Sequence, residues 1–199
     1  MQHLLLATTN PDKLREIRRV LARIPVEIVT LGDLPQVRDP EETGTTFEEN
    51  ARLKALYYDA AVGNAERYTV AEDSGLVIDA LNGQPGVHSA RFLRPDASYP
   101  ERFSEIYRRL APHSRPWVGR FVCAVAVVHR GALMYETTGI IEGWIADAPR
   151  GEGGFGYDPI FYYPPYDRTL AETSEEQKLS VAHRGQAFRQ LAIWLEQLG

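Results

Sequence analysis

The chain has 199 residues, 44% hydrophobic and 25% charged, values typical of a soluble globular protein with one domain or two lobes. A net charge of −5 argues against nonspecific binding to nucleic acid or a membrane surface, so an anionic ligand would need a local cluster of cations. The single cysteine excludes an intrachain disulfide, and neither a signal peptide nor a membrane helix is recognisable. We therefore expect a cytoplasmic protein that forms a single domain over residues 1–199.

The N-terminal part of the chain predicts a βαβ unit. The apolar run Leu4–Thr8 predicts a buried strand, and a helix follows with Asn10 as N-cap and Pro11 at its first position. Val26–Leu31 predicts a second strand, so the two strands should be parallel. One apolar face of the helix should be formed by Leu14, Ile17, Leu21 and Ile24.

A second helix is predicted over Thr45–Ala61, where Thr45/Glu48 and Thr46/Glu49 both have capping-box spacing. The stretch 68–79, "YTVAEDSGLVID", comes next. Its β-branched, apolar start predicts a buried strand that ends at two adjacent acids, Glu72 and Asp73, before a new apolar segment begins.

The rest of the chain predicts an α/β fold with a mixed sheet. Tyr99–Leu110 reads as a helix, and residues 117–145 as a long antiparallel hairpin that turns around His129–Gly131. A glycine-rich loop leads into a short aromatic segment. The C-terminal stretch 174–198 predicts a helix, in which Gly185 suggests a break or a close approach. Its apolar face should comprise Phe188, Leu191, Leu195 and Leu198.

The segment "TTNPDK" has the composition of an anion site at the start of a helix. Free amides of the first turn, the hydroxyls of Thr8 and Thr9, and Lys13 would together bind phosphate. Lys13 sits at the positive end of the helix dipole, where a cation is mildly unfavourable. The alternative is a capped surface helix with a solvated lysine.

Lys54 lies on a helix face that otherwise looks core-facing. At 100° per residue it falls in one narrow stripe with Phe47, Ala51 and Tyr58. A buried lysine needs an anion from the protein or from a ligand. Alternatively, the side chain could extend along the edge of the core to solvent.

Two further segments combine polar and aromatic groups. The loop "GEGGFGYD" is followed by no helix, so it is no dinucleotide fingerprint, and the chain has no P-loop motif. The loop presents Phe155, Tyr157 and Asp158, which would suit an aromatic base unless the two rings belong to the core. Lys178, His183 and Arg184 form either a cation cluster, with Arg184 pointing inward, or a basic helix surface.

Adjacent carboxylates that cannot both ionise cheaply usually share a proton or a divalent cation. The pairs Glu41/Glu42 and Glu72/Asp73 are such groups, and their hard oxygens, without clustered His or Cys, favour Mg²⁺ shared with substrate phosphates. The residues alone thus indicate an Mg²⁺-dependent enzyme that acts on a nucleoside polyphosphate.

Five segments resemble, in order, the motifs of the inosine/xanthosine triphosphate pyrophosphatase family: "ATTNPDK", "EETGTTFEENARLKA", "AEDSGLVIDALNGQPGVHSARF", "GFGYDPIF" and "SEEQKLSVAHRGQA". The resemblance implies Mg²⁺-dependent hydrolysis of ITP, dITP, XTP and dXTP to the monophosphate and pyrophosphate, which removes non-canonical purine nucleotides. It also implies an elongated mixed sheet flanked by helices, two lobes around a central nucleotide-binding cleft, and a homodimer.

The resemblance assigns roles to individual residues. Asp73 would accept the proton of the attacking water and bind the metal, with Glu72 and Glu42 as further metal ligands. His183 and Arg184 would donate hydrogen bonds to the 6-keto group of the purine. The residues expected to contact the nucleotide are Thr8, Thr9, Asn10, Pro11, Asp12, Lys13, Lys54, Ser74, Phe155, Gly156, Tyr157, Asp158, Lys178, His183 and Arg184.

Two other functions fit the same residues. One is a related Mg²⁺ enzyme that hydrolyses canonical or methylated nucleotides, which a substrate panel would distinguish. The other is a nucleotide-binding regulator without activity, which the intact Glu72/Asp73 pair disfavours.

Overall fold

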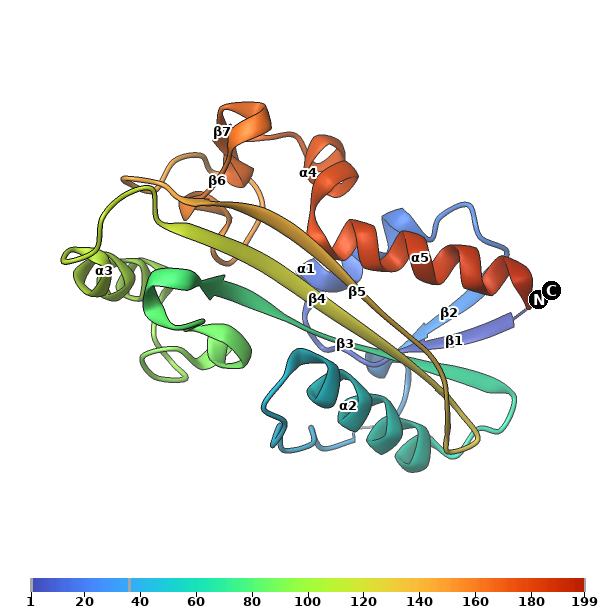
Figure 1. The fold of residues 1–199 in the computed structure, drawn as a ribbon. Helices are drawn as coiled ribbons and strands as arrows, with labels where there is room; N and C mark the ends of the chain where they lie inside the picture. The colour runs from blue at the N-terminus through green and yellow to red at the C-terminus, as the bar shows by residue number, and fades with distance from the viewer. Residues whose placement is uncertain (1, 36, 199) are drawn as a thin grey trace. The chain divides into compact units, whose positions relative to one another are not determined.

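The structure is a computed structural model that describes residues 2–35 and 37–198 (Figure 1). The strands are β1 (Gln2–Leu6), β2 (Val26–Thr30), β3 (Arg67–Ile78), β4 (Val118–His129), β5 (Ala132–Ile145), β6 (Phe161–Tyr163) and β7 (Arg168–Thr169). The α-helices are α1 (Pro11–Val20), α2 (Phe47–Val62), α3 (Tyr99–Leu110), α4 (Glu175–Val181) and α5 (His183–Gln197). The strands form a mixed sheet in the order β2-β1-β3-β4-β5-β6-β7, so the predicted α/β fold is confirmed.

The chain divides into two compact units. Unit 1 comprises Met1–Asp73, Cys123–Gly139 and His183–Gly199, and unit 2 comprises Ser74–Val122 and Ile140–Ala182. This division agrees with the two lobes expected from the sequence. The single domain over 1–199, the elongated shape and the central cleft stay predictions.

Unit 1 is built around the predicted βαβ element. β1 is parallel to both β2 and β3, and its residues Leu4, Leu5 and Leu6 are all buried. Consecutive burial requires cover on both faces of the strand, as is usual in parallel sheets. Figure 1 shows α1 and α5 on one face of this part of the sheet and α2 on the other. The strand residues Leu4, Leu6 and Val70 therefore share a core with the helices α1 and α5.

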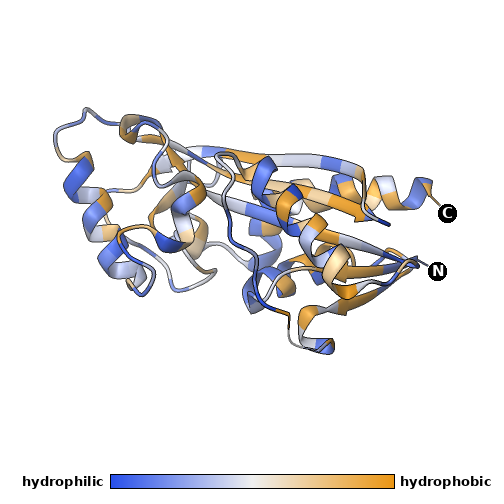
Figure 2. Ribbon diagram, turned by 90° about the horizontal axis from the view of Figure 1, so that it is seen from below, coloured by the Kyte–Doolittle hydropathy of each residue, from blue (hydrophilic) through white to orange (hydrophobic). Residues whose placement is uncertain are grey.

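Local capping determines where the first two long helices begin. Asn10 caps α1 as predicted, since its side chain accepts hydrogen bonds from the amides of Asp12 and Lys13. Thr46 and Glu49 form the predicted capping box of α2. Thr45 instead donates its amide and hydroxyl to Glu49, so the alternative Thr45/Glu48 box does not form. Along the helices, hydrophobic and hydrophilic residues alternate in bands (Figure 2), as the 3.6-residue period requires.

The prediction that a strand ends at Glu72 and Asp73 is wrong. β3 runs without interruption from Arg67 to Ile78, and both acids lie within it, buried. Two adjacent charges look like a strand end because burying them without partners would be prohibitive. Cations from three separate helices supply those partners, and the sequence around β3 does not reveal them.

The predicted hairpin consists of β4 and β5. Arg130 and Gly131 connect them with φ angles of 52° and 75°, the left-handed conformation required at both positions of a type I′ turn. Such a two-residue turn makes the strands antiparallel. Gly139 of β5 permits a close approach within unit 1, because a Cβ atom there would lie 2.1 Å from the carbonyl oxygen of His183.

Unit 2 has its own apolar core. α3 spans the predicted residues and contributes Phe103, Ile106 and Leu110, which pack with strand residues of β3, β4 and β5. The glycine-rich loop and the aromatic segment add Tyr157 and Phe161 to the same core.

The C-terminal helix is interrupted, but not at Gly185. α4 ends at Val181, Ala182 adopts an extended conformation with ψ 153°, and α5 begins at His183, which leaves Gly185 inside a regular helix. Leu198 is exposed because α5 has already ended at Gln197, so its predicted place on the apolar face is wrong. In the described part of the chain, no helix is long and apolar enough to cross a membrane.

Candidate active site

The centre of the site in unit 1 is the pair of acids in β3. Side chains alternate between the two faces of a strand, so Glu72 and Asp73 point to opposite faces. Glu72 meets groups from α1 and α5, whereas Asp73 meets groups from α2. β1 pairs with β3 only as far as Val70, so both acids lie just beyond the carboxyl end of β1. This edge is where parallel sheets usually bind ligands.

Glu72 is held by two cations. Its Oε1 lies 2.7 Å from Nζ of Lys13 and 3.4 Å from Nη2 of Arg184, and the thiol of Cys123 donates to its Oε2 at 3.5 Å. Burial alone would raise the pKa of Glu72, but the charges of Lys13 and Arg184 outweigh it and hold the pKa well below its usual range. Glu72 is therefore a fixed anion at any physiological pH.

Asp73 has a different environment. Its Oδ1 lies 2.8 Å from Nζ of Lys54, and the amide of Asn50 donates to its Oδ2 at 3.2 Å. Burial raises the pKa of Asp73 and outweighs the lowering effect of Lys54. This environment is the one a general base needs, since a raised pKa brings a carboxylate closer to the operating pH.

Lys54 shares its ammonium between two acids, because Nζ lies 3.0 Å from Oε1 of Glu42 as well. Burial alone would lower the pKa of Lys54, but the nearby carboxylates, Asp73 first, raise it. The pKa values of Asp73 and Lys54 thus both rise, whereas in an isolated ion pair the acid's would fall. The causes differ, because burial raises the pKa of Asp73, whereas the nearby carboxylates raise the pKa of Lys54.

The predicted anion site at the start of α1 is only partly formed. Asn10 takes the amides of Asp12 and Lys13 at 2.9 and 3.1 Å, and the amide of Asn10 itself donates to the hydroxyl of Thr8. The prediction of free first-turn amides is therefore wrong, because the N-cap side chain already binds them. A phosphate here would depend on Lys13 and the threonine hydroxyls, and the predicted contacts of Thr8, Thr9, Asn10, Pro11 and Asp12 stay predictions.

Arg184 points inward, as predicted, and is only 2% exposed. Its Nη1 lies 2.7 Å from Oε2 of Glu16, and its Nη2 reaches Glu72. His183, the first residue of α5, is also buried. The hydrogen bonds of His183 and Arg184 to a purine base stay predictions. Arg184 also contacts Glu72 and so orients its carboxylate.

In unit 2 the glycine-rich loop is fixed by an ion pair between Lys178 and Asp158, both buried. Asp158 accepts the amide of Phe155 at 2.8 Å, and Nζ of Lys178 lies 4.6 Å from the centre of the Phe155 ring. These contacts attach the loop to α4. The predicted substrate contacts of Ser74, Gly156, Lys178 and the other loop residues stay predictions.

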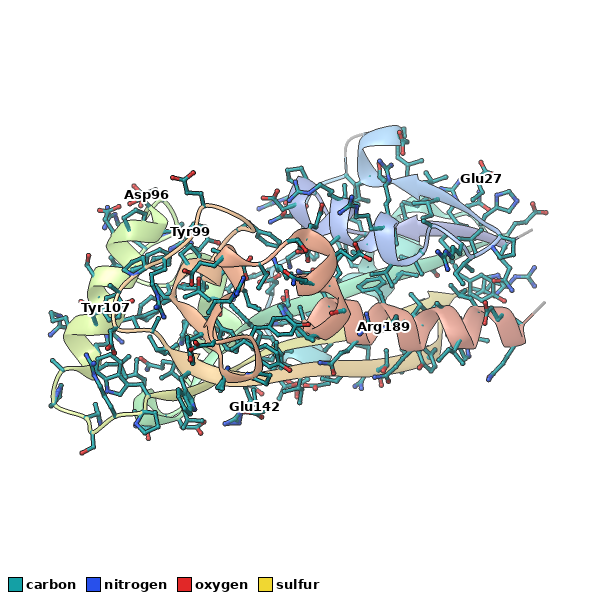
Figure 3. All side chains as sticks on the ribbon, turned by 90° about the horizontal axis from the view of Figure 1, so that it is seen from above. Glu27, Asp96, Tyr99, Tyr107, Glu142 and Arg189 are labelled. Carbon is teal, nitrogen blue, oxygen red and sulfur yellow. The ribbon has the colours of Figure 1, made fainter. Side chains whose placement is uncertain are left out.

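Tyr157 belongs to the core of unit 2, the alternative left open for the loop aromatics. Its hydroxyl donates to the carbonyl of Ser89 at 2.8 Å, and burial raises its pKa. Tyr99 of α3, labelled in Figure 3, packs edge-on against its ring with centroids 5.3 Å apart. Tyr157 therefore anchors the loop, while Phe155 is half-buried beside Lys178.

The acidic side chains of unit 1 have the kind of oxygen ligands that Mg²⁺ prefers, but in the part of the chain that the structure describes they are not gathered into a metal site. Glu42, Glu72 and Asp73 provide hard carboxylate oxygens. Within residues 2–35 and 37–198, however, no three acidic, histidine or cysteine side chains gather closely enough to hold a metal. Mg²⁺ often needs only one or two protein carboxylates when substrate phosphates supply further ligands, so the donor set fits a metal that binds together with a nucleotide.

Two residues that contact site side chains were not predicted from the sequence. Asn50 is fully buried and links the amide of Gly44, at 2.8 Å, to Asp73. Glu16 is buried against Arg184. A polar residue beside the core-facing stripe of α2 was a usable signal for Asn50, whereas the partner of Glu16 lies 168 positions away in sequence.

Comparisons with known proteins show which family this chain belongs to. The sequence profile of the Ham1 family matches residues 4–194, nearly the whole chain. The chain belongs to the Ham1 family. It is 43% identical over 202 residues to a dITP/XTP pyrophosphatase of Geobacillus kaustophilus, covering 100% of this chain and 97% of that protein. It is 46% identical over 195 residues to a dITP/XTP pyrophosphatase of Gloeobacter violaceus, covering 96% and 93%.

Solved structures of Ham1 proteins have the same fold. The HAM1 protein of Coxiella burnetii matches with a TM-score of 0.90 at 38% identity, covering 99% of this chain and 100% of that one. The Ham1 protein of Staphylococcus aureus matches with a TM-score of 0.88 at 34% identity and full coverage of both chains.

Proposed function

We propose that this protein hydrolyses non-canonical purine nucleoside triphosphates (ITP, dITP, XTP and dXTP) to the monophosphate and pyrophosphate, removing them from the nucleotide pool. The names of the G. kaustophilus and G. violaceus relatives support this substrate class. The observation that carries the proposal is Asp73, a buried carboxylate with a raised pKa that lies 2.8 Å from Lys54.

In the proposed reaction, Asp73 takes the proton of a water molecule that attacks the α-phosphorus. A new P–O bond forms there, the bond to the bridging oxygen of the β-phosphate breaks, and pyrophosphate leaves with the electron pair. Asn50 donates to Oδ2 of Asp73, which helps to fix the direction in which the base accepts the proton. Lys13 and Lys54 stabilise the charge that develops on the leaving group.

We propose Mg²⁺ as the cofactor, with Asp73 and Glu42 as its nearest candidate ligands on the α2 face of β3 and Glu72 on the opposite face. When bound, the ion would neutralise phosphate charge. Lys54 contacts both Glu42 and Asp73, so a metal held by these two carboxylates would require its ammonium group to turn toward the phosphates. Glu72 would act mainly as the fixed anion that places Lys13.

His183 and Arg184 are the proposed donors to the 6-keto group, which inosine and xanthosine carry and adenosine lacks. Both residues belong to the same unit as Asp73 and Lys54, and both are buried, so an adenine amino group, itself a donor, would face further donors there. The homodimer and the cytoplasmic location implied by the sequence are further proposals.

The function is tested by pyrophosphate release from ITP, XTP, GTP and ATP, with and without Mg²⁺. We expect ITP and XTP to be hydrolysed with the highest kcat/KM and the rate to depend on the metal. Asp73→Asn should lower kcat by about 100-fold or more while ITP still binds. Asp96→Asn is the matched control, since the Asp96 side chain is 83% exposed.

Two results would contradict the proposal. Absence of pyrophosphate release from every inosine and xanthosine triphosphate, with metal present, would exclude the activity. A kcat of Asp73→Asn close to that of the wild type would leave the activity intact but remove Asp73 as the base.

A further inference from the structure

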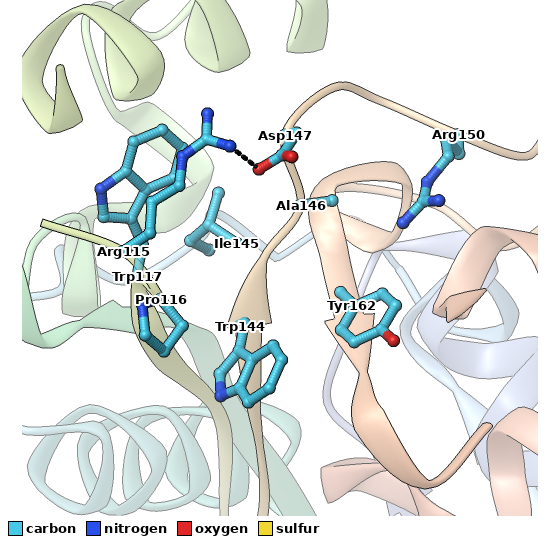
Figure 4. A pocket seen from close by; sticks show the side chains of 9 residues that line it. All are labelled: Arg115, Pro116, Trp117, Trp144, Ile145, Ala146, Asp147, Arg150 and Tyr162. Carbon is cyan, nitrogen blue, oxygen red and sulfur yellow. Dashed lines mark ion pairs between the residues drawn. The ribbon is translucent and has the colours of Figure 1, made fainter. Parts of the chain in front are cut away.

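Unit 2 contains a cavity of about 450 Å³ that none of the proposed catalytic residues lines (Figure 4). This volume is within the range of small-molecule sites. All the lining residues belong to unit 2, and none lies in the glycine-rich loop segment 155–158. They are Arg115, Pro116, Trp117, Trp144, Ile145, Ala146, Asp147, Arg150 and Tyr162.

One wall of the cavity is a pair of stacked aromatic rings. Trp144 of β5 and Tyr162 of β6 are direct cross-strand neighbours, and their rings are inclined by only 18° with centroids 5.7 Å apart. Trp144 is 40% exposed, so its large ring is not used to fill the core. Trp117, by contrast, is buried as part of that core. The wall therefore offers a partly exposed aromatic surface made of two stacked rings.

Two guanidinium groups flank the aromatic side chains. Arg115 lies over the ring of Trp117 at 4.4 Å and forms an ion pair with Asp147, drawn in Figure 4. Arg150 lies 5.7 Å from the centre of the Tyr162 ring, and its Nε lies 3.8 Å from Oε2 of Glu172.

The two arginines of the lining each have one acidic neighbour. Arg115 is paired with Asp147, and Arg150 lies 3.8 Å from Glu172, which is not part of the lining. The Asp147 side chain is 73% exposed, so its ion pair with Arg115 is well screened and can be exchanged for a stronger anion at little cost. Guanidinium groups bind phosphate in bidentate geometry better than they bind an exposed carboxylate.

We infer that this cavity is a second ligand site, which binds a nucleotide with its base stacked on the Trp144–Tyr162 wall and its phosphate on Arg150, the guanidinium group beside Tyr162. Aromatic stacking accepts any base, because every base has a π-face. The site would therefore bind adenine nucleotides, which the proposed donors His183 and Arg184 oppose. This inference is independent of the proposed hydrolysis, since it concerns binding alone.

The test is equilibrium binding of AMP to the full chain by calorimetry, with adenosine and inorganic phosphate as separate probes. We expect saturable binding of AMP, at least tenfold weaker binding of adenosine, and no measurable binding of phosphate alone. Trp144→Ala and Arg150→Met should each weaken AMP about tenfold. Trp144→Phe, which keeps a ring, should retain most of the affinity. Thermal unfolding verifies that the variants fold.

Two control variants separate this site from the acidic cluster. Lys54→Met alters unit 1 and Arg23→Met removes an exposed arginine of unit 1, so both should bind AMP like the wild type. Loss of AMP binding in Lys54→Met with retention in Trp144→Ala would overturn the inference. So would the absence of saturable binding below about 1 mM, or equal affinity for adenosine and AMP.

Discussion

Replacing Glu72 by Gln removes the anion that Lys13 and Arg184 share. Glu72 is 1% exposed as a side chain and lies 2.7 Å from Nζ of Lys13, while Arg184 also keeps a contact with Glu16. Breaking a buried ion pair on one side costs about 3–5 kcal/mol. We expect the lower end, about 3 kcal/mol, because Glu16 still neutralises Arg184 and the glutamine oxygen still accepts a hydrogen bond.

The assay is urea or thermal unfolding of wild type and variant at several pH values. For a chain of this length, a loss of about 3 kcal/mol lowers Tm by roughly 6–12 °C at neutral pH. The pKa of Glu72 is lower in the folded protein than its ordinary value of 4.5. Its contribution is therefore complete above pH 4.5 and is lost as the pH falls below that value. The difference between wild type and variant should shrink accordingly.

The matched control is Glu27→Gln. The Glu27 side chain is 52% exposed and its partner is His3, so the change should alter the free energy of unfolding by less than about 0.5 kcal/mol. Equal stability of Glu72→Gln and wild type at pH 7 would refute the reasoning. A stability difference that persists unchanged into acid would show that packing, not charge, is responsible.

Two further predictions concern positions that support the site. Asn50→Ala should shift the acidic limb of the profile of kcat/KM against pH to higher pH, because Asp73 loses a hydrogen-bond donor that favours its ionised form. A purely structural defect would lower kcat/KM without moving that limb. Gly139→Ala should destabilise the protein by about 1–3 kcal/mol in urea unfolding, since the added Cβ would meet the carbonyl of His183. Gly32→Ala, with only an ordinary contact at 3.6 Å, is its control, and equal losses in both variants would contradict the close approach.

Helix starts were predictable because they depend on neighbours in sequence. Asn10 and Thr46 cap α1 and α2 with side chains that bind amides two or three residues away. The inward direction of Lys54 and Arg184 was predictable too, since helical periodicity alone places them with apolar residues. The break in the C-terminal helix fell at Ala182 rather than Gly185, because intrinsic propensity is weak compared with tertiary packing.

What the sequence by itself determined is the α/β order of elements, the caps, and the set of acids and cations available for chemistry. The tertiary structure decided which of these acids and cations contact one another. Glu72 and Asp73 are neighbours in the chain, yet β3 turns them to opposite faces, one toward Lys13 and Arg184, the other toward Lys54. The physical reason is that burying a charge depends on partners from distant helices, which no local pattern specifies. The same folding made one acid a fixed anion and the other a candidate base.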